Sequence, residues 1–281
     1  MTAQHHLARS ADEDPATEVI PRFDEREAGA APTGARAPAP AEPSPAAQPP
    51  AGAPHLALLR PSRVVVAAGV IAALLATAHF GAAVYGIGRP GFEIPAPIRL
   101  GNELNISTWF SSAMHLANAA ILALIAANSV RRERWRWILL SLACAVVAMD
   151  ETAANHEQVS WVIHTTFGTS GLLTYAWIIP ASVLVLVLAA LCLPMLLRRP
   201  GSWIVVAGAA VFLFGAVGLE AVGGLVFEQT GDVHAFGYNL LAGAEETCEM
   251  AGLVIAMAGL LRMAGGSGLR IAGTTFVDGS R

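Results

Sequence analysis

The chain has 281 residues, of which 54% are hydrophobic and 14% are charged, and its mean hydropathy is +0.54. These values exclude an ordinary soluble globular domain and indicate a polytopic membrane protein with the lipid bilayer as its first partner. The formal net charge of -4 gives no basis for a nucleic-acid partner.

The N-terminal region differs in composition from the rest of the chain. Residues 1–60 are rich in alanine and proline, with scattered charges and few aromatic residues. Such a segment buries too little apolar surface to offset its chain entropy, so we expect a disordered cytoplasmic tail there. Residues 61–265 form the predicted membrane domain, and residues 266–281 form a short C-terminal tail.

Six apolar stretches are each long enough, at about 20 residues or more, to cross a bilayer as a helix. They lie near residues 64–86, 106–129, 137–158, 172–197, 203–227 and 239–263. The sequence therefore predicts an all-α polytopic bundle of about six transmembrane helices.

Arginine placement predicts the orientation of these helices. Arginines cluster at the ends where the first, third and fifth stretches begin, and by the positive-inside rule both termini are cytoplasmic. All 17 basic residues are arginine, which we interpret as the codon bias of a GC-rich bacterial genome. The expected location is therefore the bacterial inner membrane.

Acidic side chains and two histidines interrupt the apolar stretches, and no arginine lies at their depth. They are Asp150, Glu151, Glu157, Glu220, Glu245, Glu246 and Glu249, with His79 and His115. An ionised carboxylate at the centre of a membrane helix costs about 2.5–3.5 kcal/mol on insertion scales. We infer that these groups are protonated, hydrated or bound to cations.

Helical geometry predicts that the ionisable groups converge. Five of the six helices place one of them about 10 Å below the outward end, at 1.5 Å per residue. A period of 100° per residue puts Asp150 and Glu157 on one face, and Glu245 and Glu249 on another. His156 points about 120° away from Asp150 and is expected to face the outer water. The other groups are expected to line a shared polar cavity.

Carboxylates and imidazoles are the ligands expected for iron, manganese or zinc. We expect His115, Asp150, Glu220, Glu245 and Glu249 to hold one or two such divalent ions. The residues expected to support or replace these ligands are His79, Ser111, Glu157 and Glu246. Glu151, as a carboxylate outside the ligand set, is the candidate catalytic proton relay.

One short motif resembles a known family. Ser111-x-x-x-His115, on a predicted transmembrane helix, resembles a motif of the alkaline ceramidase and progestin–adipoQ receptor superfamily of zinc-dependent membrane hydrolases. The likeness covers five residues. That superfamily has seven helices and a His-x-x-x-His on the last one, where this chain has Glu245-x-x-x-Glu249. The resemblance implies amide or ester hydrolysis as one chemistry. Oxidation–reduction is the other chemistry that such metal ions support, so we expect a metal-dependent membrane enzyme, either a hydrolase or an oxidoreductase, with a lipid-soluble or external substrate.

Other functions remain open at this point. The same carboxylates suit a proton- or cation-coupled transporter, although the cytoplasmic halves of the helices are apolar and no inverted repeat is evident. His79 and His115 lie at equal depth and permit a haem between their helices. Protonated acids that hydrogen-bond across helices would serve structure alone. The Gly- and Ala-rich faces also permit a homo-oligomer.

Overall fold

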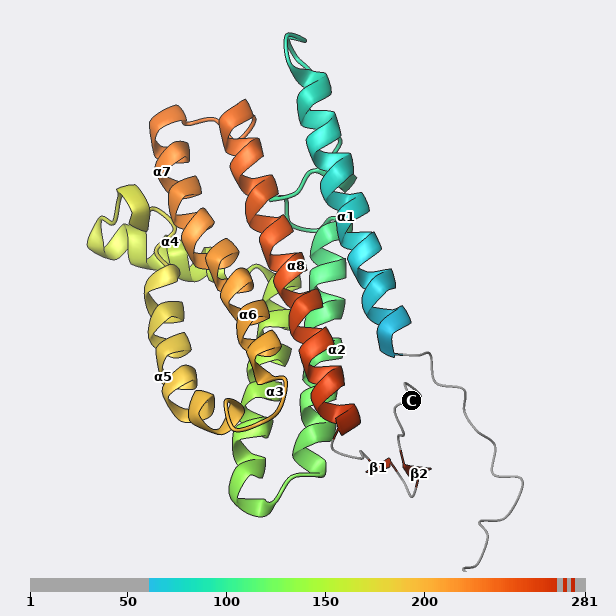
Figure 1. Ribbon diagram of the computed structural model, residues 1–281. Coiled ribbons are helices and arrows are strands. Elements are labelled where there is room, and N and C mark those ends of the chain that lie inside the picture. The colour runs from blue at the N-terminus through green and yellow to red at the C-terminus, as the bar shows by residue number, and fades with distance from the viewer. Residues whose placement is uncertain (1–60, 267–269, 272–273, 276–281) are drawn as a thin grey trace, which may run out of the picture. The chain divides into compact units, whose positions relative to one another are not determined.

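The computed structural model describes residues 61–266, 270–271 and 274–275 (Figure 1). The predicted N-terminal tail, and most of the predicted C-terminal tail, lie outside these residues. Apart from the two-residue strands β1 and β2, the described part is a helical membrane bundle, as the sequence predicts. Its elements are α1 (Pro61–Gly86), η1 (Ala96–Ile98), α2 (Ile106–Ala127), α3 (Arg131–Ala153), α4 (Asn155–Phe167), η2 (Gly171–Leu173), α5 (Ile178–Leu196), α6 (Ser202–Leu213), the π-helical η3 (Phe214–Leu219), α7 (Glu220–Thr230), α8 (Phe236–Gly266), β1 (Arg270–Ile271) and β2 (Thr274–Thr275).

Five helical segments of the described chain are long and apolar enough to cross a membrane. They are Pro61–Gly86, Ile106–Ala127, Ile178–Leu196, Ser202–Thr230 and Phe236–Gly265. The number rises to six if α3 and α4, which meet at a bend of 79°, count as one broken span. The prediction of about six spans is therefore confirmed.

A break at Ala154 separates α3 from α4. Ala154 has a left-handed backbone with φ of 49°, and its N–H donates to the carbonyl oxygen of Asp150 at 2.8 Å. This conformation ends α3, because a left-handed residue cannot continue a right-handed helix. The prediction of one continuous helix over residues 137–158 is therefore wrong. Asp150 and Glu157, which were expected to share a helical face, lie on two different helices.

The helix α8 packs against α1, α2, α6, η3 and α7. Its contact with α6 is very close because glycines line it. A Cβ atom on Gly208 would lie 2.4 Å from the nitrogen of Ala256, and one on Gly252 would lie 2.5 Å from the nitrogen of Phe212. Small residues of this kind let membrane helices approach until their backbones touch.

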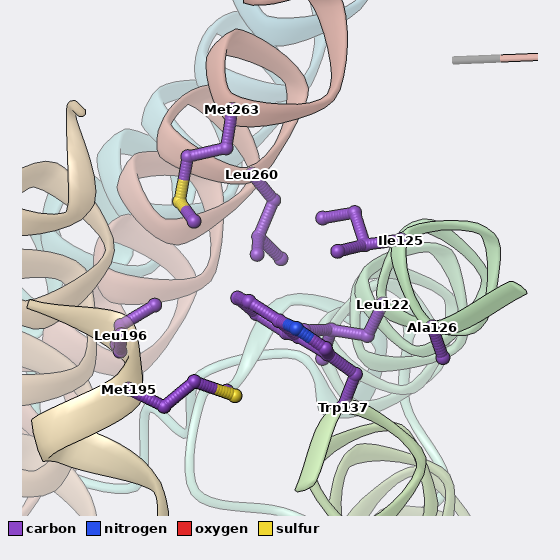
Figure 2. Close-up of a cluster of buried hydrophobic side chains, with 8 residues drawn as sticks. All are labelled: Leu122, Ile125, Ala126, Trp137, Met195, Leu196, Leu260 and Met263. Atoms are coloured by element: carbon purple, nitrogen blue, oxygen red, sulfur yellow. The ribbon is translucent and has the colours of Figure 1, made fainter. Parts of the chain in front are cut away.

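A hydrophobic core fills the end of the bundle where α3 begins and α2, α5 and α8 end (Figure 2). Its buried members are Leu122, Ile125, Ala126, Trp137, Met195, Leu196, Leu260 and Met263. We call this end the arginine end, because it carries Arg131, Arg132, Arg134, Arg136, Arg198, Arg199 and Arg262. We call the opposite end, where the loop of residues 99–105 lies, the site end.

Candidate functional site

Six of the predicted residues come together from four elements toward the site end. We call them the carboxylate cluster: His115 on α2, Glu151 on α3, Glu220 on α7, and Glu245, Glu246 and Glu249 on α8. Glu151 and Glu249 each interact electrostatically with Glu220 and Glu246. Among the described residues, no arginine forms an ion pair with any of the six. The cluster therefore brings several carboxyl groups together without an arginine that would neutralise their charge.

The π-helical segment η3 brings α7 close to the acidic part of α8. A Cβ atom on Gly215 would lie 2.7 Å from the carbonyl oxygen of Glu245 and 3.1 Å from Cγ of Glu249, so only glycine fits there. The π-helical turn also sets the direction of Glu220, the first residue of α7, whose Oε1 accepts a hydrogen bond of 2.8 Å from Nε1 of Trp177. Such turns recur at functional sites in membrane and soluble helices.

His115 is the most informative member of the cluster. Its side chain is only 5% exposed, and its Nε2 lies 3.8 Å from Oε1 of Glu151. The ring packs edge-on against Phe212, with centroids 5.1 Å apart. Within the described chain, neither ring nitrogen has a hydrogen-bond partner, and the same holds for the Oγ of Ser111 one turn before it. A buried polar atom without a partner costs about 1–3 kcal/mol, so a water molecule or a bound ligand is expected beside these atoms.

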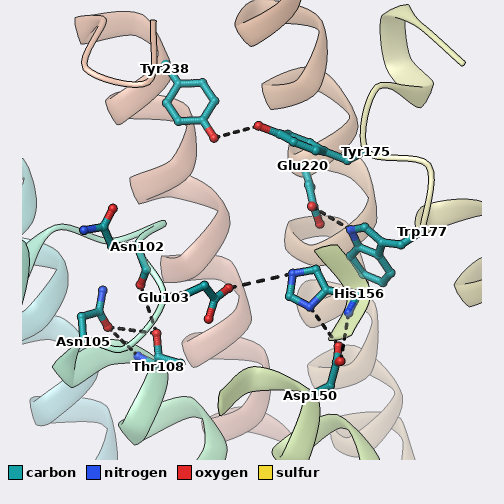
Figure 3. Close-up of polar contacts among 10 residues, drawn as sticks. All are labelled: Asn102, Glu103, Asn105, Thr108, Asp150, His156, Tyr175, Trp177, Glu220 and Tyr238. Atoms are coloured by element: carbon teal, nitrogen blue, oxygen red, sulfur yellow. Dashed lines mark hydrogen bonds and ion pairs between the residues drawn. The ribbon is translucent and has the colours of Figure 1, made fainter. Parts of the chain in front are cut away.

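A second group of polar residues, formed by Asp150, His156 and Glu103 (Figure 3), is more exposed to solvent than His115 and Glu151 of the cluster. His156 bonds Asp150 through its ring, with Nδ1 at 2.9 Å from Oδ2, and through its backbone N–H, at 3.1 Å from Oδ1. Its Nε2 lies 3.9 Å from Oε1 of Glu103. The expectation that His156 simply faces outer water is therefore wrong, because the bend at Ala154 returns this ring to Asp150.

Glu103 belongs to this group although the sequence pattern gives it no role, because it lies in a loop between two predicted helices. Burial raises its pKa to about 7, the neighbouring carboxylates of Glu157, Glu246 and Asp150 also raise it, and His156 opposes them. A glutamate in a loop gives no sequence signal of this kind, because its neighbours come from other parts of the chain.

The loop that carries Glu103 is fastened to α1 and α8. The N–H of Leu100 donates to Nδ1 of His79 at 3.0 Å, and Nε2 of His79 donates to the carbonyl oxygen of Asn239 at 2.9 Å. The N–H of Gly101 donates to the carboxylate of Glu246. His79 is fully buried, and both of its nitrogens hold this loop in place. Neither nitrogen is free to ligate a haem or a metal ion as it stands.

A cavity of about 580 Å³ opens beside these residues at the site end. Its lining includes Glu103, the exposed Glu157, Tyr175 and Tyr238. The two tyrosine hydroxyls lie 3.0 Å apart (Figure 3), and burial raises the pKa of Tyr175. Glu157 therefore lies at the mouth of the cavity and not in the carboxylate cluster.

The predicted ligands do not form a finished coordination sphere. In the described part of the chain, no three His, Cys, Asp or Glu side chains are placed to hold one metal ion. Asp150 is occupied by His156, Glu220 accepts from Trp177, and Glu151, the predicted proton relay, faces His115.

The fold and this site define a class: a polytopic helical membrane protein with a buried carboxylate–histidine cluster near one end of its bundle. Residues 63–264 match the model of a family described as a domain of unknown function, DUF8692, and the chain belongs to that family. No curated protein and no solved structure matches the chain.

Proposed function

We propose that this membrane protein binds a divalent metal ion, either iron, manganese or zinc, in the carboxylate cluster. The observation that carries the proposal is His115, whose two buried nitrogens have no hydrogen-bond partner in the described chain while a glutamate oxygen lies 3.8 Å away. Imidazole nitrogen and carboxylate oxygen are the donors that these metals take in proteins.

His115, Glu151 and Glu249 are the first ligands we propose. Glu249 interacts electrostatically with Glu151. Because glutamate has three rotatable side-chain bonds, we propose that a change of rotamer brings both carboxylates to the imidazole. A divalent ion neutralises two carboxylates that would otherwise have to be protonated or hydrated at this depth. Glu220 and Glu245, which interact electrostatically with Glu249, supply further oxygens for the same ion or a second one.

We propose that the site end faces the outside of a bacterial inner membrane and that both termini are cytoplasmic. The arginine end carries most arginines of the described chain, as the positive-inside rule requires of a cytoplasmic side. A metal ion and a substrate would then reach the cluster from outside through the cavity beside Glu103.

A metal-dependent membrane enzyme, either a hydrolase or an oxidoreductase, is the activity we propose for this site. The ion would supply Lewis-acid or redox chemistry. Glu246 lies beside the proposed ligands, and its buried Oε2 has no hydrogen-bond partner in the described chain. This oxygen is suited to accept a proton from a water or substrate held in the cluster.

The proposal is tested by the metal content of the full chain, purified in detergent without chelator and measured by inductively coupled plasma mass spectrometry. We expect one or two equivalents in the wild type, and the equivalent held by the carboxylate cluster should be lost in Glu249→Gln and in His115→Gln. Glu93→Gln is the matched control, because Glu93 is an exposed carboxylate at the same end of the bundle. A metal content that is unchanged in both cluster substitutions, or no metal even after titration with all three ions, would refute the proposal.

A proton- or cation-coupled transporter is the competing proposal, since it uses the same carboxylates. The apolar core at the arginine end, which includes the fully buried Trp137, offers no carboxylate for such a route and counts against this proposal. Proton or cation flux into liposomes that disappears in Glu220→Gln, from protein that binds no metal, would favour the transporter.

A further inference from the structure

We infer that His156 and Glu103 form a second divalent-metal position at the mouth of the carboxylate cluster, with Asp150 as its positioning residue. The inference rests on the proposed function, because this outer position would receive the ion before the inner ligands do. It adds two residues, His156 and Glu103, that neither the helical pattern nor the family assigns to a site.

Asp150 determines which nitrogen of His156 is available. A carboxylate accepts hydrogen bonds and does not donate them, so the 2.9 Å contact with Oδ2 places the proton on Nδ1. In the neutral ring, which is the form that binds a metal ion, Nε2 then carries the lone pair. A histidine held by a carboxylate at one nitrogen and left open at the other is the usual arrangement behind a metal ligand.

The ring of His156 is held in position from two further sides. Its backbone N–H, which lies in the first turn of α4 and has no partner within the helix, donates to the second oxygen of Asp150 at 3.1 Å. The indole of Trp177 packs against the ring with centroids 5.3 Å apart. Because both oxygens of Asp150 accept hydrogen bonds from His156, we assign Asp150 the role of holding His156 in place, where the sequence predicts a metal ligand.

The distance between His156 and Glu103 fits two ligands of the same metal ion. Nε2 and Oε1 are 3.9 Å apart, which is too long for a hydrogen bond. Two donors that each lie about 2.0–2.2 Å from one metal ion are separated by roughly 3–4.3 Å for bond angles between 90° and 180°. The inner pair, His115 and Glu151, has nearly the same separation of 3.8 Å.

The outer pair lies between water and the inner cluster. Glu103 lines the cavity of about 580 Å³ together with Glu157, which interacts electrostatically with it and is suited to complete the outer ligand set. Glu103 also interacts electrostatically with Glu246 and Glu151 in the cluster. At the inner end, the unpartnered nitrogens of buried His115 supply an independent sign of a ligand.

The test is a titration of the metal-free full chain in detergent with Mn²⁺, followed by electron paramagnetic resonance of the free ion, and with Zn²⁺ by calorimetry. We expect two equivalents in the wild type. His156→Gln and Glu103→Gln should each bind one, and Glu249→Gln should keep the outer equivalent. Asp150→Asn should weaken the outer equivalent by about 10- to 100-fold without changing the inner one, and Asp150→Glu should recover part of this loss.

His234→Gln is the matched control. Its Nδ1 also lies 3.9 Å from a glutamate oxygen, that of Glu93, but the Nη1 atom of Arg99 lies 3.2 Å from the same nitrogen. The neighbouring cation disfavours a metal ion there, so this variant should bind two equivalents.

The outcomes separate the two proposals. If the wild type, His156→Gln and Glu103→Gln bind metal with equal stoichiometry and affinity, and Glu249→Gln loses it, the outer position is refuted and the proposed function stands. If the wild type binds neither of these ions nor Fe²⁺, the proposed function fails and the outer position fails with it. Glu103→Gln decides the matter should His156→Gln not fold, because Glu103 lies on a loop with its side chain 35% exposed.

Discussion

Replacing Gly252 by alanine tests whether close contact between α6 and α8 holds the carboxylates of α8 in place. A Cβ atom at this position would lie 2.5 Å from the nitrogen of Phe212 and 2.6 Å from the carbonyl oxygen of Gly208. Both are backbone atoms, which cannot rotate away as a side chain would. The helices must therefore separate, or one of them must bend.

The size of the effect follows from these distances. Ordinary contact begins near 3.4 Å, so α6 and α8 must move apart by about 0.9 Å. A gap of this size forfeits a quarter to a half of the dispersion energy between facing atoms. Overpacking typically costs about 1–3 kcal/mol, and the better helix propensity of alanine returns about 0.5–1 kcal/mol. We expect Gly252→Ala to lower the free energy of unfolding by about 1–2 kcal/mol.

The assay is equilibrium unfolding in mixed micelles of dodecyl maltoside and sodium dodecyl sulfate, followed by circular dichroism. Gly81→Ala is the control, since Gly81 is a helical glycine of α1 with no atom within 4 Å of an added Cβ. It should leave stability unchanged or raise it by about 0.5–1 kcal/mol. If Gly252→Ala is as stable as Gly81→Ala, the contact between α6 and α8 is looser than the structure has it, and the reasoning fails.

Three further substitutions probe the bend, the loop and the arginine end. Ala154→Gly should raise the unfolding free energy by about 1 kcal/mol, because φ is 49° at this residue and glycine adopts this conformation without strain. A lower melting temperature in a thermal melt would contradict the left-handed turn. His79→Phe should lower it by about 2–4 kcal/mol, since Leu100 and Asn239 each lose a buried hydrogen bond; an unchanged melting temperature would show that the loop is fastened elsewhere. Glu133→Gln removes a half-exposed ion pair with Arg199 and should change stability by less than about 1 kcal/mol in the same melt; a larger loss would show that the pair is shielded from water.

The sequence by itself was sufficient for the helices and for the acidic character of the site. A membrane helix satisfies its own backbone hydrogen bonds, so the length and hydropathy of one segment determine whether it spans the bilayer. The depth of Glu151, Glu220 and Glu249 follows from the same local count along each helix. These properties depend on residues within a few turns of one another, and for this reason the pattern alone was informative.

Only the tertiary structure decided how the outer part of the site is built. Nothing in the composition around Ala154 marks it as left-handed, since alanine favours the continuation of a helix. The position of His156 over Asp150 depends on that turn, and the contact with Glu103 depends on a loop that His79 fastens to α8. Such contacts join segments far apart in the chain, and their free energy comes from packing and burial that no local pattern records.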